Sequence, residues 1–220
     1  MRLAAGTQIP AKALVFDMDG TLIDSSLAIA RLWRQWASRH SADADLVIRE
    51  SAGRRAVEVI RLFGPPGLDA GTEASMLTDK ALEETEGLVA LPGAASLLRA
   101  LPSSAWAIVT SARSDLARKW LAHTGLPTPD LVIGSESVST GKPHPEGYLQ
   151  AIRRLGVEPA ETIVFEDAPA GIAAGRATGA KVIALGTMLS EAELDGQPWI
   201  VDFSGISYDA DAGLLTIGTR

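Results

Sequence analysis

Cysteine is absent from this 220-residue chain, which excludes disulfide bonds, thiolate metal sites and cysteine nucleophiles. Histidine occurs only three times, as His40, His123 and His144, and these residues lack the spacing of a metal site. We therefore predict that none of the histidines is a ligand. Any metal site in this protein has to be built from oxygen ligands.

Long apolar runs and an excess of positive charge are absent as well. No apolar stretch reaches the roughly 18 residues of a spanning helix, and the opening MRLAAGTQIP lacks the apolar segment of a signal peptide. We therefore expect neither a membrane partner nor secretion, and the cytoplasm is the expected location. Lys and Arg total 20 against 27 Asp and Glu and form no cluster, which argues against a nucleic-acid partner. The sequence makes no prediction of oligomeric state.

The apolar content of 46% is enough for a substantial core, and its pattern indicates an α/β fold. Short continuous apolar runs, typical of parallel strands covered on both faces, occur at 13–16, 106–109, 131–133, 162–165 and 182–185. Helical patterns that stop at Gly125, Gly156 and Gly179 separate the later runs. This alternation predicts a Rossmann-like, doubly wound parallel sheet, with an edge strand expected at 199–203.

Residues 23–87 interrupt this alternation. They show three helical patterns without a strand-like run. The first can be capped by Ser25 or Ser26 and has apolar residues at a 3.6-residue period, namely Ile29, Leu32, Trp33 and Trp36; the other two fall at about 54–63 and 72–86. The sequence therefore predicts a helical cap domain at 23–87, inserted into a catalytic core made of residues 1–22 and 88–220.

Asp17 and Asp19 follow the first apolar run, and side chains two apart on a strand point the same way. Two like charges about 4 Å apart repel by roughly 4 kcal/mol at an effective dielectric of about 20. The later strands also lead into polar residues, and the carboxyl ends of parallel strands lie along one edge of a sheet. We therefore predict that Asp17 and Asp19 meet the polar residues of the later strands in one cleft. The polar residues of the later strands are Thr110, Ser111, Lys142, Glu166 and Asp167.

Carboxylates without thiolate or histidine neighbours are hard ligands, which predicts Mg²⁺ as the cofactor rather than zinc or copper. A cation held by Asp17 and Asp167 would relieve the repulsion and could also bind a phosphate oxygen. Lys142 would supply a second positive charge, and Thr110 or Ser111 could donate hydrogen bonds to the same phosphate. The cleft thus has the parts of a phosphoryl-transfer centre.

Four stretches of the chain carry these residues, in the order DMDGT (17–21), Thr110-Ser111, GKPHP (141–145) and EDAPAGI (166–172). Together they resemble the four ordered motifs of the haloacid dehalogenase-like superfamily. The insertion after the first motif is similar to the cap that closes over small phosphorylated substrates in one of its subfamilies. ETEG at 84–87 and LPGA at 91–94 look most similar to phosphatases of sugar and polyol phosphates, of the 2-deoxyglucose-6-phosphatase and glycerol-3-phosphatase type.

The resemblance implies a role for each carboxylate. Asp17 is the implied nucleophile, which forms an aspartyl-phosphate. Asp19 is the implied general acid and base, and its presence favours phosphate esters over the carbon–halogen or phosphonate bonds that other members cleave. Asp17, the backbone carbonyl of Asp19 and Asp167 are the implied Mg²⁺ ligands, with Glu166 either a further ligand or a neighbour of the ligands.

Two arginines and three tryptophans are the remaining residues for which the sequence predicts a place at the substrate cleft, on the surface or in the core. Arg54 and Arg55 stand where a cap loop would reach over the cleft, so they are candidate substrate contacts, with surface charge as the other interpretation. Trp33, Trp36 and Trp120 fall on apolar helix faces and are predicted to be core residues. The alternative is that Trp33 or Trp36 lines the substrate cleft.

The predicted function is a Mg²⁺-dependent phosphatase for a small-molecule phosphate ester, a sugar or polyol monophosphate. The alternative is a phosphomutase of the β-phosphoglucomutase type. Ala52-Gly53 weakens this alternative, because related mutases, and also several sugar phosphatases, carry His-Gly at that position. A third interpretation is a non-catalytic binding protein on the same fold. Taken one at a time, the polar residues also allow structural roles: Thr110, Ser111 and Asp167 as helix caps, Lys142 as a surface lysine, and Glu166 as a structural carboxylate.

Overall fold

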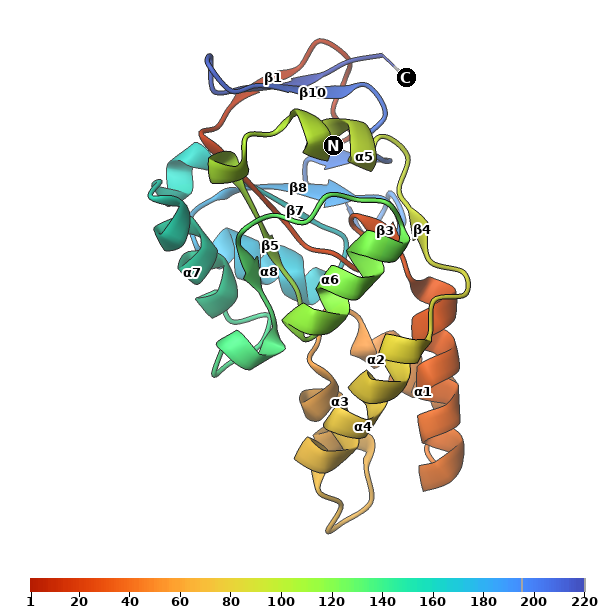
Figure 1. Ribbon diagram of the computed structural model, residues 1–220. Coiled ribbons are helices and arrows are strands. Elements are labelled where there is room, and N and C mark those ends of the chain that lie inside the picture. Colours follow the sequence, from red (N-terminus) through yellow and green to blue (C-terminus); the bar gives the residue numbers. More distant parts are fainter. Residues whose placement is uncertain (195, 220) are drawn as a thin grey trace.

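The computed structural model describes residues 1–194 and 196–219 and is built around a six-stranded parallel sheet (Figure 1). The strand order is β6-β5-β2-β7-β8-β9, and each neighbouring pair runs parallel. The strands are β2 (Ala13–Phe16), β5 (Trp106–Val109), β6 (Val132–Ile133), β7 (Thr162–Glu166), β8 (Lys181–Leu185) and β9 (Trp199–Ile200). The predicted α/β fold is confirmed, and the expected edge strand is present but ends at residue 200.

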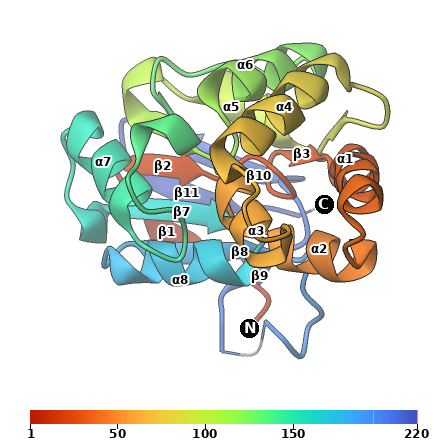
Figure 2. The same cartoon turned by 90° about the horizontal axis from the view of Figure 1, so that it is seen from below.

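Helices cover both faces of this sheet (Figure 2). Val15 and Val164 belong to the apolar cluster that includes residues of α7 and α8, whereas Phe16 and Phe165 belong to the cluster that includes residues of α5 and α6. Alternate side chains of each central strand are therefore buried on opposite faces, which explains the continuous apolar runs. The helices are α5 (Ala94–Ala100), α6 (Ser114–His123), α7 (Glu146–Leu155) and α8 (Pro169–Ala177), with 3₁₀ turns η1 (Ser103–Ala105), η2 (Ser135–Ser137) and η3 (Pro159–Glu161).

Three phenylalanines form the centre of one apolar cluster. The rings of Phe16 and Phe165, on the adjacent strands β2 and β7, stack with centroids 4.9 Å apart and an angle of 7° between planes. Phe203 presents its edge to both, at 5.9 Å and 5.4 Å. The segment after β9 is thereby fixed to the middle of the sheet.

A separate three-stranded antiparallel sheet, in the order β1-β11-β10, lies beside the core (Figure 1). It joins residues near both chain ends, with β1 at Gln8–Pro10, β10 at Ile206–Asp209 and β11 at Leu214–Ile217. The sequence analysis does not predict this sheet. Its strands are only three or four residues long, and their pairing depends on contacts between distant parts of the chain.

The insertion is helical and lies to one side of the sheet (Figure 1). Its helices are α1 (Ser26–His40), α2 (Ala44–Ser51), α3 (Ala56–Phe63) and α4 (Ala70–Glu83). The chain enters through β3 (Ile23–Asp24) and returns through β4 (Val89–Ala90), which pair antiparallel, so the predicted boundaries at 22/23 and 87/88 fall next to this ribbon. The eight-residue α2 is the one helix here that the sequence analysis does not anticipate. No helix within the described ranges is both long enough and apolar enough to cross a bilayer.

Replacement of the edge-on ring by Phe203→Ala is expected to lower the free energy of unfolding by about 3–5 kcal/mol, because it leaves a cavity against two packed rings. The measurement is urea unfolding followed by circular dichroism. Leu62→Ala is the control, since Leu62 is 61% exposed and its truncation should cost under about 0.5 kcal/mol. Equal effects of the two substitutions would contradict a central role for Phe203.

Candidate active site

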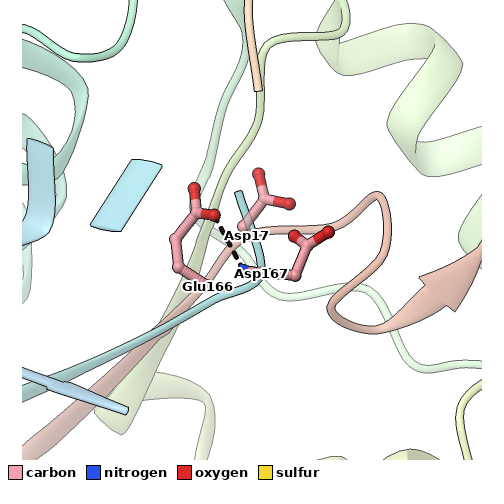
Figure 3. A group of neighbouring side chains, drawn as sticks. All are labelled: Asp17, Glu166 and Asp167. Atoms are coloured by element: carbon pink, nitrogen blue, oxygen red, sulfur yellow. Dashed lines mark hydrogen bonds between the residues drawn. The ribbon is translucent and has the colours of Figure 1, made fainter. Parts of the chain in front are cut away.

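The carboxyl ends of β2 and β7 bring three acidic side chains together (Figure 3). Asp17 directly follows β2, Glu166 is the last residue of β7, and Asp167 comes next. All three are buried, and one carboxylate oxygen of each lies within 4.8 Å of the others. The structure thus gathers three of the four residues expected at the metal, while the side chain of Asp19 lies outside this group.

Lys142 is the positive charge of the site. Its ammonium, on a side chain that is 5% exposed, donates hydrogen bonds to Asp17 Oδ1 at 2.5 Å and to Glu166 Oε1 at 2.6 Å. Burial alone would lower the pKa of Lys142, but the carboxylates of Asp17 and Glu166 outweigh it and raise the pKa above the ordinary value. Lys142 is therefore a fixed cation that bridges the carboxyl groups of Asp17 and Glu166.

Asp17 stands in an environment that opposes its ionisation. Burial raises its pKa to about 8, against the opposing attraction of Lys142, and the charge of Glu166 adds to the rise. One lysine therefore does not offset the desolvation of Asp17 together with the nearby acidic groups. A further positive charge at this place would favour the ionised form of Asp17.

Glu166 has both carboxylate oxygens engaged by the protein. Oε1 accepts hydrogen bonds from Lys142 and, at 2.8 Å, from the Tyr148 hydroxyl, whereas Oε2 accepts from the amides of Asp167 and Ala168 at 2.9 Å and 3.1 Å. A Cβ at Gly171 would lie 1.6 Å from Oε1, so the carboxylate occupies space beside α8 that only glycine leaves open. This geometry matches the alternative in which Glu166 is a neighbour of the ligands that holds Lys142.

Asp167 is the least satisfied of the carboxylates. Its Oδ1 accepts a hydrogen bond from Thr21 Oγ1 at 3.0 Å, but its buried Oδ2 has no hydrogen-bond partner among the described residues. Burial, followed by the charges of Glu166 and Asp17, raises the pKa of Asp167 well above the ordinary value. A buried oxygen without a donor, beside a second carboxylate, fits a divalent cation that prefers hard oxygen ligands. Asp17 and Asp167 are the residues that would hold it.

Asp19 lies beside this group and is only partly buried. Its Oδ1 accepts a hydrogen bond from Ser25 Oγ at 2.7 Å, and burial raises its pKa. The raised pKa favours the protonated form, which a general acid requires.

The two hydroxyls that follow β5 have different surroundings. Thr110 is buried, and its Oγ1 accepts a hydrogen bond from the amide of Ala112 at 3.1 Å. Ser111 donates from Oγ to the carbonyl of Gly53 at 2.7 Å, across the boundary between core and insertion. In this structure Ser111 therefore connects the two parts of the chain in addition to standing at the predicted phosphate site.

A cavity of about 610 Å³ lies between the core and the helical insertion. Asp17, Asp19 and Asp167 line it on the core side, and Arg54 contributes a cationic side chain from the insertion. The wall is otherwise largely apolar and includes Ile29, Leu32, Trp33, Ile48, Leu77, Leu116 and Trp120. All three predicted core tryptophans are buried, and both Trp33 and Trp120 are also cavity residues.

Arg55 does not line this cavity, unlike its neighbour Arg54. Its guanidinium is occupied by Glu58 and by the backbone carbonyls of Val138 and Ser139. Of the two predicted substrate contacts on the insertion, the structure therefore places Arg54 at the cavity and Arg55 away from it.

Three residues whose side chains contact the carboxylates have no catalytic role predicted from the sequence. Thr21 and Ser25 donate hydrogen bonds to Asp167 and Asp19, respectively, and Tyr148 donates to Glu166. The position of Thr21 within DMDGT is a signal for its role. Tyr148 has no such signal, because its position fits the apolar face of a helix equally well.

In the absence of a divalent cation, the free energy of unfolding is expected to fall as the pH rises from about 5 to 8. Folding raises the pKa of Asp17 to about 8, so within this window the folded protein binds more protons than the unfolded chain. The expected slope is up to about 1.4 kcal/mol per pH unit for each such group. Urea unfolding in a chelator across this range measures it, and a stability that rises steadily with pH would contradict the electrostatics described above.

Asp167→Asn removes one of the clustered charges and is expected to stabilise the cation-free protein by about 1 kcal/mol or more at pH 8. Added Mg²⁺ should raise the melting temperature of the unchanged protein more than that of the variant, because binding to the folded state adds stability. Thermal unfolding with and without MgCl₂ checks both statements. Asp45→Asn, at a side chain that is 90% exposed, is the control for the loss of an aspartate.

Comparison with known proteins gives consistent matches over most of the chain. The family model of the haloacid dehalogenase-like hydrolases matches residues 11–179. Hexitol phosphatase A of Escherichia coli is 42% identical over 178 residues, which cover 79% of this chain and 82% of that protein. Glycerol-1-phosphate phosphohydrolase 2 of Saccharomyces cerevisiae is 39% identical over 186 residues, covering 80% and 74%. The crystal structure of a hydrolase from Pseudomonas syringae superposes with a TM-score of 0.77 at 24% identity, covering 87% and 94% of the two chains. The chain belongs to the haloacid dehalogenase-like hydrolases.

Proposed function

We propose that this protein is a Mg²⁺-dependent phosphatase that hydrolyses a sugar or polyol monophosphate through an aspartyl-phosphate. The observation that carries the proposal is the cavity floor, where Asp17 and Asp19 both follow the carboxyl end of β2 and Lys142 contacts Asp17. Both curated relatives described above are named as phosphatases of polyol phosphates, which supports this substrate class. The phosphate is expected at the carboxylates, with the alcohol part toward the insertion.

In the first step, a carboxylate oxygen of Asp17 attacks phosphorus and the ester P–O bond breaks. Asp19 transfers its proton to the departing alkoxide, for which its raised pKa prepares it. Lys142 offsets the negative charge of the transferring phosphoryl group, and the hydroxyl of Thr110 is a further candidate donor to it. The product alcohol leaves, and the phosphoryl group remains on Asp17.

In the second step, Asp19, now ionised, takes a proton from water as the water oxygen attacks phosphorus. The bond between phosphorus and the Asp17 oxygen breaks, so phosphate and the carboxylate are regenerated. Mg²⁺, held by Asp17 and Asp167, would supply positive charge that stabilises the oxygens of the phosphoryl group. Glu166 keeps Lys142 in place through both steps.

The insertion decides whether water or another hydroxyl attacks the phosphoryl group. Ala52 lines the cavity and offers only a methyl group, without an acid or base to activate a sugar hydroxyl. This absence of a proton carrier at residue 52 supports hydrolysis rather than transfer between positions of a sugar.

Asp17→Asn is expected to reduce phosphate release by at least about 10³-fold with the fold intact, because an amide cannot act as the nucleophile. The assay measures phosphate released from sugar, polyol and nucleoside monophosphates with Mg²⁺. Asp45→Asn should keep the full rate. A rate near that of the unchanged protein in Asp17→Asn would remove Asp17 from its role.

The same panel tests the alternatives. Sugar phosphate isomers that form without free phosphate would indicate a phosphomutase instead. A folded protein that binds esters but converts none would indicate a binding protein. Full activity in excess chelator would contradict the proposed dependence on Mg²⁺.

A further inference from the structure

The segment that carries Lys142 is held from two sides. From the core, the Glu146 carboxylate accepts hydrogen bonds from the amides of Ser139 and Thr140, at 2.8 Å and 3.0 Å. From the insertion, Arg55 donates to the carbonyl of Val138 at 3.0 Å and to that of Ser139 at 3.1 Å. The backbone just before Lys142 therefore depends on both parts of the chain.

Glu58 completes the contact from the insertion. Its Oε1 accepts a hydrogen bond from the amide of Gly141 at 3.3 Å, and the same oxygen accepts from Arg55 at 2.9 Å and 2.6 Å. The side chains of Arg55 and Glu58 are only 13% and 24% exposed, and both come from the start of α3. They act on the segment as one paired unit.

Gly141 allows this close approach. A Cβ at residue 141 would lie 2.7 Å from Arg55 Nε and 2.9 Å from both Glu58 oxygens, so a larger residue would displace the pair. Gly141 directly precedes Lys142, whose ammonium reaches Asp17 and Glu166. A shift of Arg55 and Glu58 would therefore displace Gly141, which a single peptide bond joins to the catalytic lysine.

We propose that Arg55 and Glu58 are positioning residues that seat residues 138–141 when the insertion lies on the core, so that Lys142 reaches Asp17. The inference rests on the proposed function, and it gives Arg55 a role other than substrate contact. Removal of the insertion from the core would break the bonds to Val138, Ser139 and Gly141 at once. Catalytic competence is thereby tied to a closed insertion.

The kinetic test compares Arg55→Ala, Arg55→Lys and Glu58→Gln with the unchanged protein on several phosphate esters. Because the pair acts through Lys142, Arg55→Ala should lower kcat by roughly 10- to 100-fold, by the same factor for every ester whatever its alcohol. Arg55→Lys should restore part of the rate, since lysine can still donate to one carbonyl. A loss confined to KM, or one that differs between alcohols, would overturn the proposal in favour of direct substrate contact.

Asp79→Ala is the matched control. Asp79 on α4 pairs with Arg113 of the core at 3.8 Å, so this variant also removes a contact between insertion and core but does not touch the Lys142 segment. Its kcat should stay near that of the unchanged protein. An equal loss in Asp79→Ala would assign the effect to general loosening of the insertion.

Gly141→Ala gives an independent check, because the added methyl group displaces the pair without removing it. The loss of kcat in Gly141→Ala should resemble that of Arg55→Ala. The double variant that combines Gly141→Ala with Arg55→Ala should be no slower than the slower single variant, since both changes break the same contact. Multiplicative losses would show that the residues act separately.

Hydrogen exchange distinguishes failure of this inference from failure of the proposed function, because it needs no substrate. The amides of residues 139–141 should exchange faster in Arg55→Ala and Glu58→Gln than in the unchanged protein and in Asp79→Ala. Unchanged exchange would overturn the inference even if the protein is a phosphatase. Faster exchange together with silence across the ester panel would support the seating of the segment and contradict the proposed phosphatase.

Discussion

The site depends on one buried ammonium group that contacts two buried carboxylates. Lys142 neutralises part of the charge of Asp17 and Glu166, yet burial still raises the pKa of Asp17. Asp167 adds a further carboxyl group, whose Oδ2 has no donor in the part of the chain that the structure describes. A buried charge cluster of this kind does little for folding by itself, because desolvation costs about as much as attraction returns. The cluster therefore fits a role in chemistry at an incompletely neutralised anionic site better than a role in folding stability.

The parallel sheet makes such a cluster possible. Strands β2 and β7 are adjacent and in register, so the residues that follow them emerge side by side at one edge. The stacked rings of Phe16 and Phe165 lie immediately before Asp17 and Glu166 on these strands, and they fix the two strand ends relative to each other. The apolar core thus supports a group of charges that would separate if the strand ends were free to move.

The positions of these residues relative to the parallel strands determine which of them can be predicted from the sequence. Asp17 and Glu166 follow from apolar runs and from the rule that parallel strands place their carboxyl ends together, and the same rule brings Lys142 to them. By contrast, the sequence predicts Arg55 as a candidate substrate contact or a surface charge, because it gives the place of Arg55 on the insertion but not the direction of its side chain. In the structure the guanidinium contacts Glu58 and two backbone carbonyls that are more than 80 residues away. The contact of Tyr148 with Glu166 and the pairing of the β1-β11-β10 sheet are not predicted for the same reason, since pairing between distant residues leaves no local periodic signal.

The core and the insertion line the cavity with different kinds of side chain. The core side carries the carboxylates at which the phosphate is proposed to bind, whereas the insertion contributes mostly apolar side chains with Arg54 as its cation. An apolar wall favours the C–H surface of a substrate and excludes water from the charges beneath it, which strengthens their interactions.

An apolar wall shields the cavity only when the insertion lies on the core. The contacts of Arg55 and Glu58 with the segment before Lys142 link this shielding to the placement of the lysine, because the same position of the insertion provides both. A partly buried ion pair suits this task better than apolar packing would. Its hydrogen bonds define one position of the segment, whereas apolar contacts tolerate sliding, and loss of these bonds would leave the two charges without their partners in any other position. In the proposed arrangement, the charged pair at the start of α3 thus makes closure of the insertion a condition for the correct placement of Lys142.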